Sequence, residues 1–122
     1  MALDFSHLIP YAPDLAWAFF LTVLAWVASL FLSVIVGAVL GLAAALTRGP
    51  VRLVIAAYVG FFRGTPLLIQ LFIIYYGGPH FGLALDAWAA GLLGLTLYGG
   101  AYATEIVRGG LLSIPRGQIE AA

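Results

Sequence analysis

The sequence predicts an all-α membrane protein with three transmembrane helices. Hydrophobic residues make up 64% of the 122 residues and charged residues only 8%, against about 25% charged residues in an average soluble domain. This composition cannot supply the polar exterior that a soluble protein of this size needs. The few charges also divide the chain into three long apolar stretches, and each reaches the ~20 residues that cross a bilayer.

The composition also excludes several classes of function. The chain has no Cys, which excludes disulfide scaffolds, thiol catalysis and cysteine metal sites. It has no Lys, so it lacks the lysine with which a P-loop binds a nucleoside triphosphate. The net charge is zero and no basic run occurs, which argues against nucleic acid as a partner. No Ser or Thr has a partner base at a sensible spacing, so we expect no enzyme, no cofactor and no metal site.

The first predicted span covers about residues 15–46 and carries no formal charge. Its length exceeds what a bilayer requires, which indicates tilt or ends that pass the interface. It is not a cleaved signal peptide, because Asp4 and Asp14 precede it where a signal carries basic residues. Small residues recur at every fourth position and predict a face that packs closely against another helix: Ala25, Ser29, Ser33, Gly37, Gly41 and Ala45.

The second predicted span covers about residues 53–77 and follows a turn at Gly49-Pro50. Pro66 lacks an N–H and clashes with the carbonyl of Phe62, which predicts a kink at this point. The carbonyl that the kink frees needs a partner inside the membrane, and Arg63 could donate to it or to an acid on another chain. Arg63 could equally snorkel to the nearby interface or take part directly in transport.

Gln70 lies seven residues after Arg63, and we expect both side chains on a similar face of the helix. An amide within a span either forms a hydrogen bond to another helix or lines a wet cavity and contacts a substrate. Both interpretations of Gln70 stay open on the sequence.

The third predicted span covers about residues 87–107 and is expected to end at Gly109-Gly110. A second stripe of small residues lies on it: Thr96, Gly100 and Thr104. Glu105 and Arg108 are three residues apart, so they should pair on one face of the helix. The pair is either an ordinary surface ion pair or part of a functional site.

The arginines predict the orientation of the three spans. With three crossings, one side of the membrane receives all arginines outside the spans: Arg48, Arg52, Arg108 and Arg116. The positive-inside rule makes this side cytoplasmic and puts the N-terminus outside. Interfacial aromatic residues then lie at the outer boundary, where such a belt is expected: Trp17, Tyr75, Tyr76 and Trp88.

The tail over residues 113–122 is polar enough to leave the membrane. Pro115 favours the start of a short helix at its first turn. A mildly amphipathic helix at the cytoplasmic surface suits insertion into a groove on a partner, and a plain surface turn is the alternative.

Three blocks of the sequence resemble polar amino-acid ABC importer permeases of the histidine/glutamine type. The first spans residues 63–72 and 75–77, and its motif residues are Arg63, Gly64, Thr65, Pro66 and Gln70. The second spans residues 100–106 and 108–110, and its motif residues are Ala101, Tyr102, Glu105 and Arg108. The third spans residues 113–122 and is similar to the start of the cytoplasmic EAA motif of that family.

The resemblance implies a permease subunit in a bacterial inner membrane. In such importers two permeases pair, as two copies or as paralogues, and two ATPase subunits beneath them bind and hydrolyse ATP. A periplasmic or lipid-anchored binding protein delivers a polar amino acid. By the resemblance, the element that couples the permease to the ATPase contains Gly117, Gln118, Glu120, Ala121 and Ala122.

Permeases of this type normally have five spans, so residues 1–122 resemble the N-terminal part of the transmembrane domain and end at the start of the coupling helix. Two other functions fit the composition. The chain could be a small membrane-embedded assembly or regulatory subunit, or half of a secondary transporter that pairs with its copy.

Overall fold

The longest element is the helix α1, Ala12–Leu46, which follows a short 3-10 turn over Ser6–Tyr11. The computed structural model describes residues 5–122, so Asp4 lies outside the described residues. The 35 residues of α1 extend for about 52 Å, which exceeds the ~30 Å of a hydrocarbon core. The first predicted span lies entirely within this helix.

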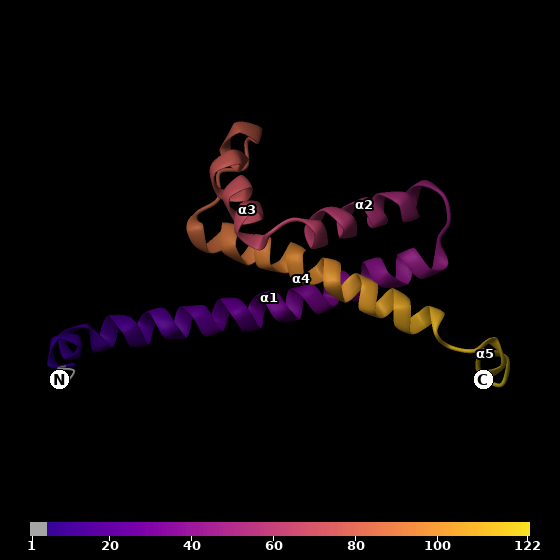
Figure 1. The fold of residues 1–122 in the computed structure, drawn as a ribbon, viewed down its shortest axis with the longest axis horizontal. Helices are drawn as coiled ribbons and strands as arrows, with labels where there is room; N and C mark the ends of the chain where they lie inside the picture. Colours follow the sequence, from indigo (N-terminus) through magenta and orange to yellow (C-terminus); the bar gives the residue numbers. More distant parts are fainter. Residues whose placement is uncertain (1–4) are drawn as a thin grey trace.

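The second apolar stretch forms two helices at a sharp angle. The helix α2, Pro50–Gly64, starts directly after Gly49, whose φ of 78° makes the predicted turn. The helix α3, Leu67–Phe72, continues into a π turn over Ile73–Gly77 and a 3-10 turn over Gly78–Phe81. The two halves are bent by 109°, and α3 stands away from the axis of α2 (Figure 1). The break is therefore sharper than a kink within one continuous span over residues 53–77.

The helix α4, Ala87–Leu112, begins at a capping residue and runs past its predicted end. The carboxylate of Asp86 accepts a hydrogen bond from the N–H of Ala89 at 2.7 Å, which satisfies a free donor of the first turn. The expectation that Gly109-Gly110 ends the helix is wrong, because both glycines are helical. A helical Gly costs only about 1 kcal/mol relative to Ala, and a long packed helix tolerates this cost.

The helix α4 is the centre of the fold and contacts α1, α2 and α3. It runs in the same direction as α1, with α2 returning between them in sequence (Figure 1). The predicted small-residue face of α1 is confirmed in its central part, where Ser29, Ser33, Gly37 and Gly41 are buried. At its two ends Ala25 and Ala45 are only partly buried, and Ala44 is buried in place of Ala45. The predicted stripe on α4 is also buried: Thr96, Gly100 and Thr104.

Glycines let the backbones of α1 and α4 come into direct contact. A Cβ atom on Gly37 would collide with the side chain and backbone of Ala103. A Cβ atom on Gly41 would lie 2.8 Å from the carbonyl oxygen of Thr104. Ser33 adds a hydrogen bond across the contact, from its Oγ to the carbonyl of Thr96 at 3.2 Å. The two helices therefore pack at the separation that small residues alone allow.

Within the described residues, one helical segment is long and apolar enough to cross a membrane, Ser6–Leu46. The bent pair of Pro50–Gly64 and Leu67–Phe81 makes a second only if it counts as one span. The helix α4 does not reach the same hydropathy, since much of its length is Gly, Thr and Tyr. The three-span count is thus not confirmed by this criterion.

Alanine at Gly37 should separate the packing effect from the effect of helix propensity. Gly60 is the matched control, because it is also inside a helix and a Cβ there meets nothing within 4 Å. Gly37→Ala should lower the free energy of unfolding by about 1–3 kcal/mol relative to Gly60→Ala, which is the usual cost of overpacking. The measurement is the unfolding of each variant in mixed micelles. Equal stability of the two variants would contradict the backbone contact between α1 and α4.

Candidate functional site

The break between α2 and α3 is built from three consecutive residues. Pro66 cannot donate to the helix, so α2 ends at Gly64. Thr65 precedes the proline and is extended, with φ −117° and ψ 146°, as the steric limit on this position requires. Its Oγ1 donates to the carbonyl of Phe61 at 2.8 Å. This bond satisfies one of the carbonyls that the end of α2 leaves free.

Gln70 satisfies two further carbonyls at the break. Its Nε2 lies 2.9 Å from the carbonyl oxygen of Phe62, 3.0 Å from that of Thr65 and 2.6 Å from Thr65 Oγ1. The residue is only 2% exposed. The donor to the freed carbonyl of Phe62 is therefore Gln70, and Arg63 makes its polar contacts elsewhere.

These contacts correct one expectation about Gln70 and favour one interpretation. Gln70 does not share a helix face with Arg63, because the chain turns by 109° between them. The hydrogen bonds of Gln70 favour the structural interpretation, since the amide holds the end of α2 against the start of α3. Its Oε1 atom is buried and has no hydrogen-bond partner among the described residues.

Arg63 reaches across to α4. Its guanidinium lies 5.2 Å from the centroid of the Tyr102 ring, within the range of a cation–π contact. Its Nη1 lies 3.9 Å from Oε2 of Glu105. The acid that the sequence suggested on another chain thus lies on this chain, and Arg63 ties the end of α2 to α4.

Glu105 pairs with Arg108 as the spacing predicted. Arg108 donates from Nε to Oε1 and from Nη2 to Oε2, both at 3.0 Å, and such bidentate pairs are the strongest of their class. Glu105 is therefore shared by two arginines. The side chains of Arg63 and Glu105 are 44% and 32% exposed, so both charges lie at the edge of the contact between α2 and α4 and not in its interior. We call these four residues the arginine–glutamate cluster: Arg63, Tyr102, Glu105 and Arg108.

The remaining predicted residues lie in two different settings. Ala101 is fully buried in α4 beside the cluster. The predicted coupling residues are exposed and lie in or directly after the helix α5, Arg116–Glu120: Gly117, Gln118, Glu120, Ala121 and Ala122. Pro115 caps this helix and accepts from the N–H of Gln118 at 3.0 Å. The segment lies beyond the end of α4 (Figure 1).

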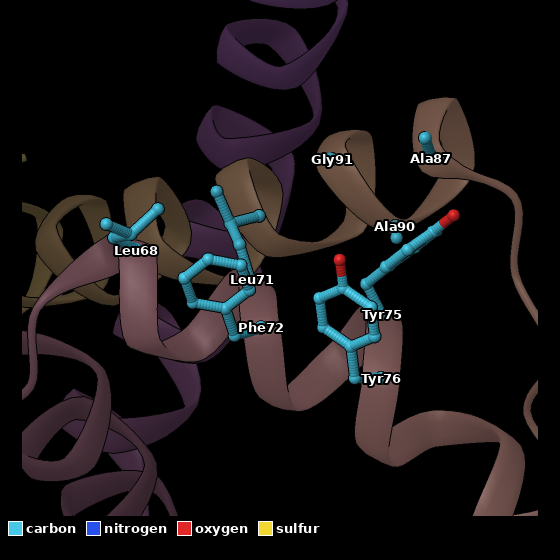
Figure 2. A pocket seen from close by; sticks show the side chains of 8 residues that line it. All are labelled: Leu68, Leu71, Phe72, Tyr75, Tyr76, Ala87, Ala90 and Gly91. Atoms are coloured by element: carbon cyan, nitrogen blue, oxygen red, sulfur yellow. The ribbon is translucent and has the colours of Figure 1, made fainter.

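An apolar cavity of about 210 Å³ lies between α3, the π turn and the start of α4. Figure 2 shows large apolar and aromatic side chains on one side and only small residues of α4 on the other. The lining residues are Leu68, Leu71, Phe72, Tyr75, Tyr76, Ala87, Ala90 and Gly91. The cavity contains no charged side chain, so it offers no counter-charge to a polar ligand.

Two tyrosines that the sequence did not single out help to hold the site. The hydroxyl of Tyr58 donates to the carbonyl of Leu97 at 2.6 Å and fixes α2 on α4. The hydroxyl of Tyr98 lies 3.3 Å from that of Tyr102 and so adjoins the cluster. The sequence could have pointed to Tyr58, because a tyrosine within an apolar run is expected to be buried and a buried tyrosine hydroxyl usually forms a hydrogen bond.

Comparison with known proteins gives a consistent set of similarities. Residues 37–122 match the family model described as "Binding-protein-dependent transport system inner membrane component". The arginine transport system permease protein ArtQ of Bacillus subtilis is 39% identical over 123 residues, which cover 100% of this chain and 56% of that protein. The L-cystine transport system permease protein TcyB of the same organism is 48% identical over 94 residues, which cover 74% of this chain and 40% of that protein.

A solved structure agrees with these relatives. The crystal structure of an amino acid ABC transporter with histidines superposes with a TM-score of 0.71 at 36% identity, over 100% of this chain and 57% of that chain. The chain spans about half the length of the curated relatives it matches.

Replacing Gln70 should destabilise the break. Gln70→Leu leaves the partly buried carbonyls of Phe62 and Thr65 without their donor, which costs up to about 1–3 kcal/mol per unsatisfied group. We expect a lower midpoint of thermal unfolding in detergent and a wider angle between α2 and α3. Spin labels on introduced cysteines at the exposed positions Val54 and Phe72 measure the angle.

The control is Gln118→Leu, because Gln118 is exposed on α5. If both variants kept the unfolding midpoint and the label distance of the parent protein, the hydrogen bonds of Gln70 would not hold the break.

Proposed function

Because the chain belongs to the family of binding-protein-dependent transport system inner membrane components, we propose that it is a membrane-spanning permease subunit of an ATP-driven importer of polar amino acids. The substrate class follows the relatives, which include permeases of arginine and L-cystine transport systems. The solved neighbour is an amino acid transporter with histidines.

The observation that carries the proposal is the meeting of two distant sequence blocks at the helix break. Arg63 on α2 contacts Tyr102 and Glu105 on α4. Irregular backbone at membrane depth is tolerated only where it is buried in protein or lines a water-filled cavity. Ionisable side chains within spans mark substrate and ion pathways. The break and the arginine–glutamate cluster are therefore where we place the translocation path.

The cluster has the chemistry that a polar amino acid requires. Such a substrate carries a carboxylate and an ammonium group, and the cluster presents both signs of charge at partly exposed positions. Glu105 compensates one of the two arginine charges while no substrate is bound, which lowers the cost of that pair in the membrane and leaves one positive charge for a substrate carboxylate.

We place α1, the pair of α2 and α3, and α4 as three spans, with the N-terminus outside. The arginines support this arrangement, because Arg48, Arg52 and Arg108 lie where α1 ends, α2 begins and α4 ends, at one end of the molecule (Figure 1). The positive-inside rule assigns this end to the cytoplasm of a bacterial cell.

The exposed α5 then lies on the cytoplasmic side, where it suits a groove on an ATPase subunit. In this proposal ATP is bound and hydrolysed by that separate subunit, and its closure displaces α5 and α4. A second permease, identical or paralogous, completes the membrane domain, and a periplasmic or lipid-anchored binding protein delivers the amino acid.

The proposed orientation predicts which positions an impermeant thiol reagent reaches. The chain has no native Cys, so Phe81→Cys and Arg48→Cys each introduce one thiol at an exposed position. In intact cells Phe81→Cys should be labelled and Arg48→Cys should not. Permeabilised cells are the control and should label both. Labelling of Arg48→Cys from outside would contradict the orientation.

Charge reversal at Glu120 should release the ATPase. Losing a charged contact at the centre of an interface costs about 2–5 kcal/mol, and even 2 kcal/mol weakens binding about thirtyfold. Glu120→Lys in the full-length permease should therefore reduce co-purification of the ATPase and uncouple ATP hydrolysis from uptake, while the inserted amount of permease is unchanged.

The matched control is Asp14→Lys, which makes the same charge change in the first turn of α1 at the other end of the molecule. It should leave the complex intact. If Glu120→Lys also retains the ATPase and normal uptake, the tail is an ordinary surface turn and not the element that couples the permease to the ATPase.

A further inference from the structure

A small pocket lined by three charged and three apolar residues lies near the end of α1, the start of α2 and the end of α4. Its volume is about 160 Å³, and Ala44, Arg52, Ile55, Ala56, Glu105 and Arg108 line it. The pocket is separate from the apolar cavity of Figure 2, which lies between α3 and the start of α4.

The charges around this pocket do not balance. Its one acid, Glu105, already accepts two hydrogen bonds from Arg108, and Nη1 of Arg63 lies 3.9 Å from Oε2 of the same carboxylate. Arg52 forms no hydrogen bond or ion pair with any described residue. Three arginines thus adjoin a single carboxylate, and the charge of Arg52 is left without a counter-ion.

The pocket also lies near the ends of two helices. Arg52 is the third residue of α2, and Ala44 lies two residues before the end of α1, so the pocket opens where these helices leave the apolar zone. Part of its lining is apolar, and the same turn of α2 exposes Val51, Leu53 and Val54. An anion with acyl chains matches both features, whereas a soluble anion matches only the arginines.

We infer that this pocket binds the phosphodiester headgroup of an anionic phospholipid, with Arg52 as its main ligand and Arg108 at its edge. Basic pockets between transmembrane helices on the cytoplasmic side are suited to such headgroups. The acyl chains lie along the exposed apolar surface of α2. The inference rests on the proposed orientation of the chain in the membrane, and it does not depend on transport or on an ATPase.

The test compares two arginines at the same end of the molecule. Arg52→Gln removes the charge that lines the pocket, and Arg48→Gln removes an exposed charge that does not line it. The intact permease is purified in neutral detergent, and phosphatidylglycerol or phosphatidylcholine is titrated while bound lipid is counted by native mass spectrometry. Arg52→Lys, which keeps the charge, and the thermal unfolding midpoint of each variant control for folding.

We expect phosphatidylglycerol to bind more tightly than phosphatidylcholine and to raise the unfolding midpoint. Arg52→Gln should weaken phosphatidylglycerol binding about fivefold, the effect of one arginine near an anionic surface, while Arg48→Gln and Arg52→Lys retain most of it. Equal weakening by Arg52→Gln and Arg48→Gln would show a diffuse interfacial charge and overturn the site. Stabilisation by inorganic phosphate alone, to the same extent as by the lipid, would overturn the lipid as its ligand.

Discussion

The contact between the backbones of α1 and α4 provides the rigid pair on which α2 and α3 are positioned. Lipid tails are as apolar as leucine, so helices in a membrane gain little from apolar burial and depend on close van der Waals packing. Gly37 and Gly41 allow that packing on α1, and Gly100 allows it on α4. The carbonyl of Thr104 faces Gly41 in this contact, and Thr104 is fully buried.

The helix break depends on this rigid pair. The hydroxyl of Tyr58 joins α2 to the backbone of α4, and Gln70 then fixes the turn from α2 into α3. A proline alone would leave carbonyl groups unsatisfied and the angle undefined, because it removes a donor without replacing it. The placement of Arg63 against Tyr102 thus follows from the fixed end of α2, and the arginine–glutamate cluster is a consequence of backbone geometry on both helices.

The sequence predicted the features that depend on local spacing. The fourfold repeat of small residues predicted the packing face of α1, Pro66 predicted an interruption, and the spacing of Glu105 and Arg108 predicted their pair. It did not predict that Gln70 donates to the break or that α3 bends away. Those features depend on which donor lies near a carbonyl after the chain has turned by 109°. The spacing of residues along the sequence does not give the distance between the Gln70 amide and the carbonyls at the break. The sequence also did not predict that α4 continues through Gly109-Gly110, because the packing of its earlier turns outweighs the low helix propensity of two glycines.

That persistence matters for the proposed coupling. The helix α4 carries three of the four cluster residues, Tyr102, Glu105 and Arg108, and continues without a break to Leu112. Residues 113–115 then connect it to α5. A continuous helix transmits a displacement that a loop would absorb. Yet a Cβ atom on Gly109 or Gly110 would meet nothing within 4 Å, so close packing does not explain the two glycines. Glycine lowers the resistance of a helix to local bending while its hydrogen bonds persist. In the proposed coupling, these two glycines are therefore the point at which the end of α4 could bend when α5 docks on a partner.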